Sequence, residues 1–129
     1  MRIYLMRTVG AAFLVELVLV ALTIPVAALF GMDAFLPFVP VTCLAVGFPF
    51  GWWAARKLQS GFVLQGTLVG IVATLIYFGL VLGQFGSVKP VFELYGPFLF
   101  FLSHAAKILG CAAGAYACGR RRMPRTAEV

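Results

Sequence analysis

Glu16, His104 and Lys107 are the residues whose chemistry most needs an explanation, because all three lie inside long apolar runs. Within a bilayer, such groups pair with one another or mark a path for protons or ions. A carboxylate and an imidazole can exchange protons, and an ammonium group can neutralise the carboxylate. His104 and Lys107 are three positions apart, so a helix would place them on one face.

The run that carries Lys107 is expected to form a helix that is only marginally stable in lipid by itself. Its seven strongly apolar residues favour insertion by about 3 kcal/mol in total, and a lysine at the membrane centre costs roughly 2.5–3.5 kcal/mol. Counted from one membrane surface at about 1.5 Å per residue, Glu16 lies about 12 Å deep and Lys107 about 16 Å. The lysine stem can bridge that difference. We therefore predict a Glu16–Lys107 contact.

Three roles for that contact remain open. It could be a buried ion pair that fixes the register of two helices, or part of a proton or ion path that includes His104. Alternatively, these groups could pair with another subunit.

The composition predicts an all-α fold, a bundle of four transmembrane helices. Of 129 residues, 63% are hydrophobic and 11% charged, whereas soluble domains are about 45–50% apolar and about 25% charged. A helix crosses the hydrocarbon core with about 20 apolar residues. The predicted transmembrane domain is 1–118, followed by a short basic tail, 119–129. Its spans are about 8–30, 35–55, 61–82 and 97–118. We expect residues 84–95 to form a loop in the membrane interface.

The basic residues predict the orientation. Eight of the ten lysines and arginines fall at the two termini or in the loop between the second and third spans. Cytoplasmic segments carry such an excess. We therefore expect a multi-pass protein of the bacterial inner (plasma) membrane with both termini in the cytoplasm. The net charge of +6 then reflects topology, and no nucleic-acid partner is expected.

Glycines four residues apart predict close helix packing, because small residues let helix backbones approach each other in lipid. The pairs are Gly47/Gly51, Gly66/Gly70, Gly79/Gly83 and Gly110/Gly114. We interpret them as packing faces within the chain. The alternative is that at least one pair forms a dimer face.

Signatures of an enzyme are missing. There is no glycine-rich phosphate loop and no Ser/His/Asp set, and a single histidine cannot supply two imidazole ligands to a metal or haem. The three cysteines form no Cys-x-x-Cys motif. We expect no enzymatic activity, no cofactor and no metal.

Two families share features with this chain. Glu16 in the first span, with Tyr4-Leu5 and Ala11-Ala12 before it, resembles the small multidrug resistance transporters. That resemblance implies a substrate-binding role for Glu16. The Gly-x-Ala-Tyr-Ala-x-Trp motif of that family is missing here and Lys107 has no counterpart, so this family is disfavoured.

The second resemblance is to the YrzE-like small bacterial membrane proteins, a four-helix family without an assigned activity. It is carried by Gly47…Gly51-Trp-Trp-Ala-Ala-Arg56-Lys57, by Gly61…Gly66…Gly70 and by Leu109-Gly110-Cys-Ala-Ala-Gly114. The resemblance covers roughly residues 45–118. It implies an architecture and no chemistry.

The expected function is a non-enzymatic role in the lipid bilayer, as an accessory subunit packed against a larger membrane complex or in an uncharacterised role. A homodimer is the alternative assembly. The alternative function is a small proton-coupled transporter that uses Glu16.

Overall fold

Helices make up nearly all of the chain that the computed structural model describes, which is residues 4–122 without the side chain of Met32. The helices are α1 (Leu5–Phe30), α2 (Met32–Phe35), the 3₁₀ turn η1 (Leu36–Phe38), α3 (Val39–Ala55), α4 (Phe62–Phe85) and α5 (Lys89–Arg122). The prediction of an all-α fold is confirmed.

Four helical stretches are long and apolar enough to cross a membrane: Leu5–Phe30, Asp33–Ala55, Phe62–Phe85 and Lys89–Arg122. They make the chain a small integral membrane protein with several spans, whose apolar helices contact the lipid bilayer. Arg2 and most of the predicted tail lie outside the described residues. The first four residues of that tail, 119–122, continue α5.

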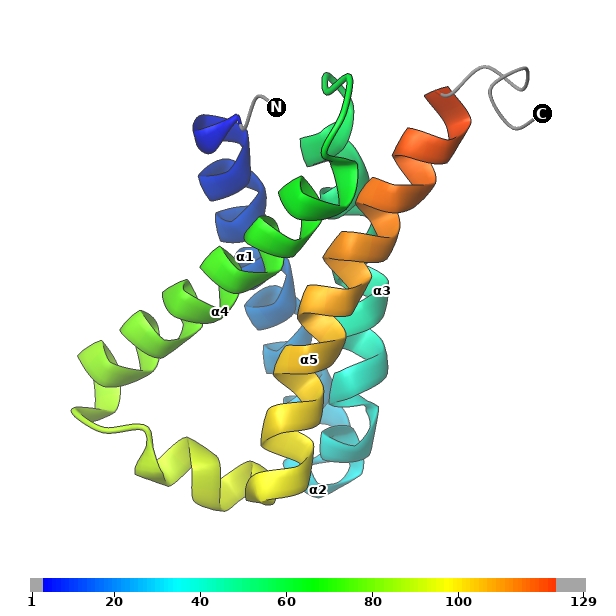
Figure 1. The fold of residues 1–129 in the computed structure, drawn as a ribbon. Helices are drawn as coiled ribbons and strands as arrows, with labels where there is room; N and C mark the ends of the chain where they lie inside the picture. The colour runs from blue at the N-terminus through cyan, green and yellow to red at the C-terminus, as the bar shows by residue number, and fades with distance from the viewer. Residues whose placement is uncertain (1–3, 123–129) are drawn as a thin grey trace.

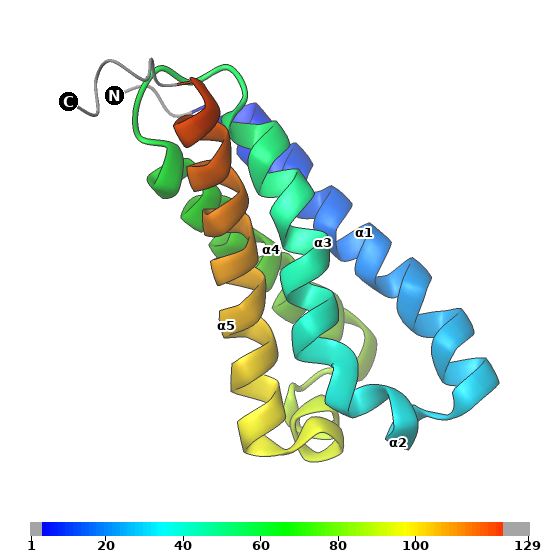
Figure 2. The same ribbon diagram turned by 90° about the vertical axis from the view of Figure 1, so that its right-hand side faces the viewer.

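The bundle has two unlike halves. We call the end where α1 begins and α5 ends the terminal end, and the opposite end the distal end. α3 and α5 lie side by side in both views, whereas α4 in Figure 1 and α1 in Figure 2 slope away from them toward the distal end. The most extensive helix contact is accordingly that of α3 with α5, followed by that of α4 with α5. The helices are therefore packed closely in the terminal half and splayed in the distal half.

The expected loop at residues 84–95 is wrong in its second half. α4 ends at Phe85, and α5 already begins at Lys89. Two features favour a helix here. Pro90 lies in the first turn of α5, where proline is well tolerated. Lys89 and Glu93 form an ion pair one turn apart, with Lys89 Nζ 3.9 Å from Glu93 Oε1. At Gly96, φ is +76°, which breaks the helix before the main span continues. The short first part of α5 consequently runs across the distal end of the bundle (Figure 1).

Candidate functional site

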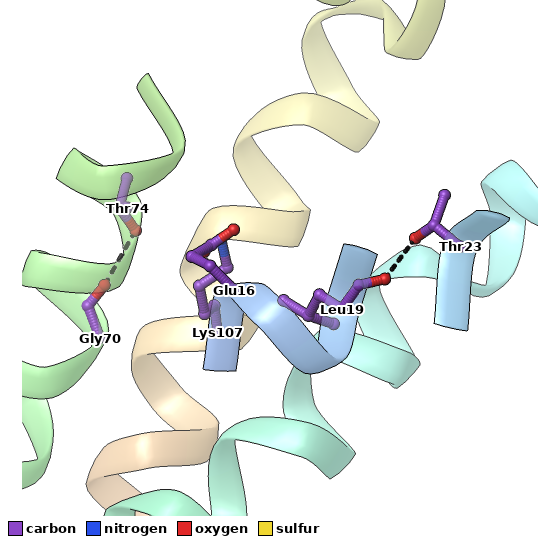
Figure 3. Close-up of polar contacts among 6 residues, drawn as sticks. All are labelled: Glu16, Leu19, Thr23, Gly70, Thr74 and Lys107. Atoms are coloured by element: carbon purple, nitrogen blue, oxygen red, sulfur yellow. Dashed lines mark hydrogen bonds and ion pairs between the residues drawn. The ribbon is translucent and has the colours of Figure 1, made fainter. Parts of the chain in front are cut away.

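Glu16 on α1 and Lys107 on α5 meet inside the bundle. Lys107 Nζ donates a hydrogen bond to Glu16 Oε1, and the two side chains are only 3% and 4% exposed. Figure 3 shows the two side chains reaching each other from their separate helices. This is the contact that the depth argument predicts. Lys107 Nζ also lies 5.1 Å from the centre of the Tyr77 ring on α4, so the ammonium group meets side chains of two other helices, α1 and α4.

The two long side chains span the distance between α1 and α5, because each of these helices packs mainly against α3 and α4. On α1, Ala12 is fully buried one turn before Glu16. Beside α5, a Cβ atom at Gly47 of α3 would lie 3.0 Å from the carbonyl oxygen of Lys107. A larger residue at that position would push α5 outward. The position of the lysine stem is therefore set by backbone packing as well as by its charge.

His104 lies one turn before Lys107 but makes no hydrogen bond with the pair. Its ring packs against Tyr77 and Phe100, each at 4.8 Å between ring centres, and against Phe78 at 5.4 Å. Its Nδ1 atom is buried and has no hydrogen-bond partner among the described residues. The three ionisable residues of the predicted site therefore lie near one another, with His104 held in an aromatic cluster.

A cavity of about 180 Å³ connects these groups. It could hold about six water molecules at ~30 Å³ each. It lies on the distal side of the ion pair, and α1, α3, α4 and α5 all contribute to its wall. The polar or ionisable residues that line it are Glu16, Thr23, Thr42, Cys43, Tyr77, Tyr95, Ser103, His104 and Lys107.

Several hydroxyl groups in and near this cavity bond to their own helices. Thr23 Oγ1 donates to the carbonyl oxygen of Leu19 at 2.7 Å, and Thr74 Oγ1 in the same way to Gly70 at 2.9 Å (Figure 3). Ser103 Oγ donates to Leu99 O at 2.7 Å. Each hydroxyl proton is thus satisfied locally, while the oxygen lone pairs stay available to a bound molecule.

Glycines bring α3 and α4 close to α5, mostly on the terminal side of the ion pair. A Cβ atom at Gly51 or Gly66 would collide with the backbone of Cys111, and one at Gly114 with the carbonyl oxygen of Phe48. A Cβ atom at Gly70 would lie 2.5 Å from Ile108 Cα of α5, and one at Gly110 would lie 2.5 Å from Leu44 O of α3. Three of the predicted pairs therefore lie at contacts between helices of this chain.

Gly79 and Gly83 differ from the other pairs. A Cβ atom at either position would meet no atom within 4 Å. This pair makes no packing contact in the described chain, because α4 has already diverged from α5 at this level. A partner outside the chain remains the alternative for this face.

Sequence reasoning missed one buried polar contact. Gln65 Nε2 on α4 donates to Thr8 Oγ1 on α1 at 2.7 Å, and both residues are 1% exposed. The Oε1 atom of Gln65 has no partner among the described residues. The available signal was a glutamine inside an apolar span, where its amide must find a partner. Tyr77 and Tyr95 were also not singled out as cavity residues, because nothing in the sequence indicates which face of each helix lines a cavity.

The arrangement offers proton exchange and the binding of a small molecule. Glu16 can accept a proton, Lys107 can donate hydrogen bonds, and aromatic rings line the wall. In the described part of the chain, no group of three His, Cys, Asp or Glu side chains could hold a metal ion. Comparison with protein-family models, curated proteins and solved structures finds no match for this chain.

Proposed function

We propose that this protein is a small proton-coupled carrier without enzymatic activity, which binds a small solute in the distal cavity. The observation that supports this most is that the cavity ends at a buried Glu16–Lys107 pair. Intramembrane ionisable residues commonly serve as sites for protons or ions. In the proposed carrier, the carboxylate of Glu16 is the proton acceptor.

The energetics of the pair favour a functional role over a purely structural one. An apolar pair of similar volume often stabilises a protein as well as a buried ion pair does, or better. The chain nevertheless carries both charges where burial is nearly complete. Protonation of Glu16 would remove the negative charge that holds Lys107 in place. Proton binding would in this way change the end wall of the cavity.

The unequal packing of the two halves also supports a carrier. On the terminal side, glycine contacts hold α3 and α4 against α5, while α1 and α4 diverge on the distal side (Figures 1 and 2). Carriers expose a central site to one side at a time by rocking one group of helices against another. In our proposal, α3 and α5 are the fixed pair, and α1 and α4 move. With both termini in the cytoplasm, the cavity faces the outside.

Proteoliposomes provide the test. Purified protein is reconstituted with a pH-sensitive dye inside the vesicles, and a panel of small neutral and charged aromatic solutes is added under an imposed pH gradient. We expect at least one solute to enter together with a change in internal pH. The Glu16→Gln variant should lose both signals, because it can no longer take up a proton.

The matched control is Glu93→Gln, which removes a carboxylate that is exposed at the distal end and does not line the cavity. This variant should keep both signals. Uptake that survives in Glu16→Gln, or no proton movement with any solute, would argue against a proton-coupled carrier.

A second candidate is an accessory subunit of a larger membrane complex. The observation in its favour is the open face around Gly79 and Gly83, on a helix that also exposes several large apolar side chains. Small residues of this spacing are typical of contacts between membrane helices. A second copy of the chain or a different protein could occupy this face.

Mild detergent extraction followed by native mass measurement distinguishes these assemblies. A subunit should co-purify with a stoichiometric partner, and replacing Gly79 and Gly83 by leucine should release that partner. The change Val63→Leu on the exposed side of the same helix is the control. A monomeric mass in native extracts would contradict the subunit hypothesis.

A further inference from the structure

The terminal end of the bundle has a second polar feature, which begins with the carbonyl groups at the end of α3 and in the turn that follows it. Arg7 of α1 donates hydrogen bonds to Trp53 O and, at 3.4 Å, to Ala54 O. Arg122 of α5 donates to Arg56 O and, at 3.1 Å, to Leu58 O. The last carbonyl groups of a helix carry partial negative charge and attract cations. Arg7 and Arg122 are thus occupied in closing this end of the helix.

An open cleft of about 570 Å³ lies beside this contact, between the end of α3 and the end of α5. Four of its six lining residues are basic. They are Trp52, Arg56, Lys57, Cys118, Arg121 and Arg122. The buried side chain of Cys118 contributes an apolar part of the wall, and the four cations are exposed.

Most of this positive charge is not neutralised within the described chain. The Arg121 guanidinium lies 5.6 Å from the centre of the Trp52 ring, which orients it without cancelling its charge. The side chains of Arg56 and Lys57 make no hydrogen bond or ion pair with any described residue. The described carboxylates belong to Glu16 in the core, and to Asp33 and Glu93 near the distal end. None of the described carboxylates therefore lies at the cleft.

We propose that this cleft binds the phosphodiester headgroup of an anionic phospholipid. Arginine and lysine are the residues that proteins use to bind phosphate oxygens. Basic pockets between transmembrane helices at the membrane surface bind the headgroups of anionic lipids. In our assignment Arg56, Lys57 and Arg121 contact the phosphate, and Arg122 forms the wall.

The position of the cleft favours a lipid over a soluble phosphate. Trp52 and Trp53 lie at the level where tryptophans mark the boundary between lipid and water. The helices that form the cleft continue from this level into the apolar spans. A lipid can therefore place its phosphate among the cations while its acyl chains follow the surface of α3 and α5.

Fluorescence quenching can test this assignment, because the chain has only two tryptophans. The Trp53→Phe variant leaves Trp52, which lines the cleft, as the single emitter. It is reconstituted in bilayers of phosphatidylcholine that contain increasing amounts of brominated phosphatidylglycerol or brominated phosphatidylcholine. We take about fivefold in affinity for each cation that contacts the headgroup, which is the magnitude for one lysine or arginine at an anionic surface. We expect about a hundredfold preference for phosphatidylglycerol from the three contacting cations.

Charge removal in the Trp53→Phe background then locates the site. Lys57→Gln should lower the preference about fivefold, and Arg56→Gln with Lys57→Gln about 25-fold. Arg120→Gln removes a cation at the same end that does not line the cleft, so it should change the preference less than twofold. Circular dichroism of each variant should show unchanged helix content, since the substituted side chains are exposed.

Three results would overturn the proposal. Equal quenching by the two brominated lipids would show that the cleft has no preference for an anionic headgroup. A loss in Arg120→Gln as large as that in Lys57→Gln would assign the preference to general positive charge. Loss of the preference in millimolar inorganic phosphate would assign the cleft to a soluble anion.

Discussion

Separate and combined replacement of Glu16 and Lys107 tests whether the two charges depend on each other. The variants are Glu16→Gln, Lys107→Met and the double variant. Each single change leaves one ionisable group buried without its partner, since both side chains are less than 5% exposed. The double change leaves a neutral amide and an apolar chain of similar volume.

The expected magnitudes follow from the burial of the pair. Removing one partner of a buried ion pair costs about 3–5 kcal/mol, whereas replacing both partners by uncharged groups is often neutral or stabilising. We expect each single variant to lose about 3 kcal/mol of unfolding free energy, which is roughly 150-fold in the folding equilibrium. The double variant should lie within about 1 kcal/mol of the parent.

Reversible unfolding in mixed detergent micelles, followed by circular dichroism, gives the three free energies. Lys89 and Glu93 provide the control pair, because their side chains are 79% and 65% exposed. Lys89→Met and Glu93→Gln should show a coupling of no more than about 0.5 kcal/mol. If the losses from Glu16→Gln and Lys107→Met simply add in the double variant, the two groups do not depend on each other and the reasoning is refuted.

Three further predictions concern packing and access. Gly114→Ala should destabilise the protein by about 1–3 kcal/mol, because the added methyl group would meet backbone atoms of α3. Gly83→Ala should stabilise the protein by up to about 1 kcal/mol, because its methyl group would meet no atom. Thermal unfolding in micelles measures both changes. Gln65→Leu should cost about 1 kcal/mol in the same assay through loss of its buried hydrogen bond, and a more stable variant would contradict that contact. N-ethylmaleimide should modify Cys43, which lines the cavity, before the fully buried Cys111, as followed by mass spectrometry of timed samples. Modification of Cys43 no faster than that of Cys111 would contradict an accessible cavity.

The sequence predicted the features that depend on length, composition and depth. The apolar runs are long enough to identify all four spans to within a few residues at most of their ends. Glu16 and Lys107 could be matched because helix rise converts residue number into depth, and because an unpaired charge in lipid is costly. Neither inference requires knowledge of how the helices cross.

The features that depend on helix crossing could not be predicted. All four glycine pairs have the same spacing, yet only Gly79 and Gly83 lack a neighbour, because α4 diverges from α5 at their level. The cavity has the same origin, since it lies where the helices splay. The spacing predicted that His104 shares a helix face with Lys107. It could not indicate that the His104 ring packs among aromatic side chains contributed by α4 and α5.

Solid-state NMR of the protein in lipid bilayers provides the most direct measurement of the proposed site. With ¹⁵N-labelled lysine and ¹³C-labelled glutamate, we expect magnetisation transfer from Lys107 Nζ to the side-chain carboxyl carbon of Glu16. That signal should disappear in Glu16→Gln and remain in Glu93→Gln. Absence of transfer in the parent protein would show that the two groups do not meet in the membrane, and would contradict the proposed site.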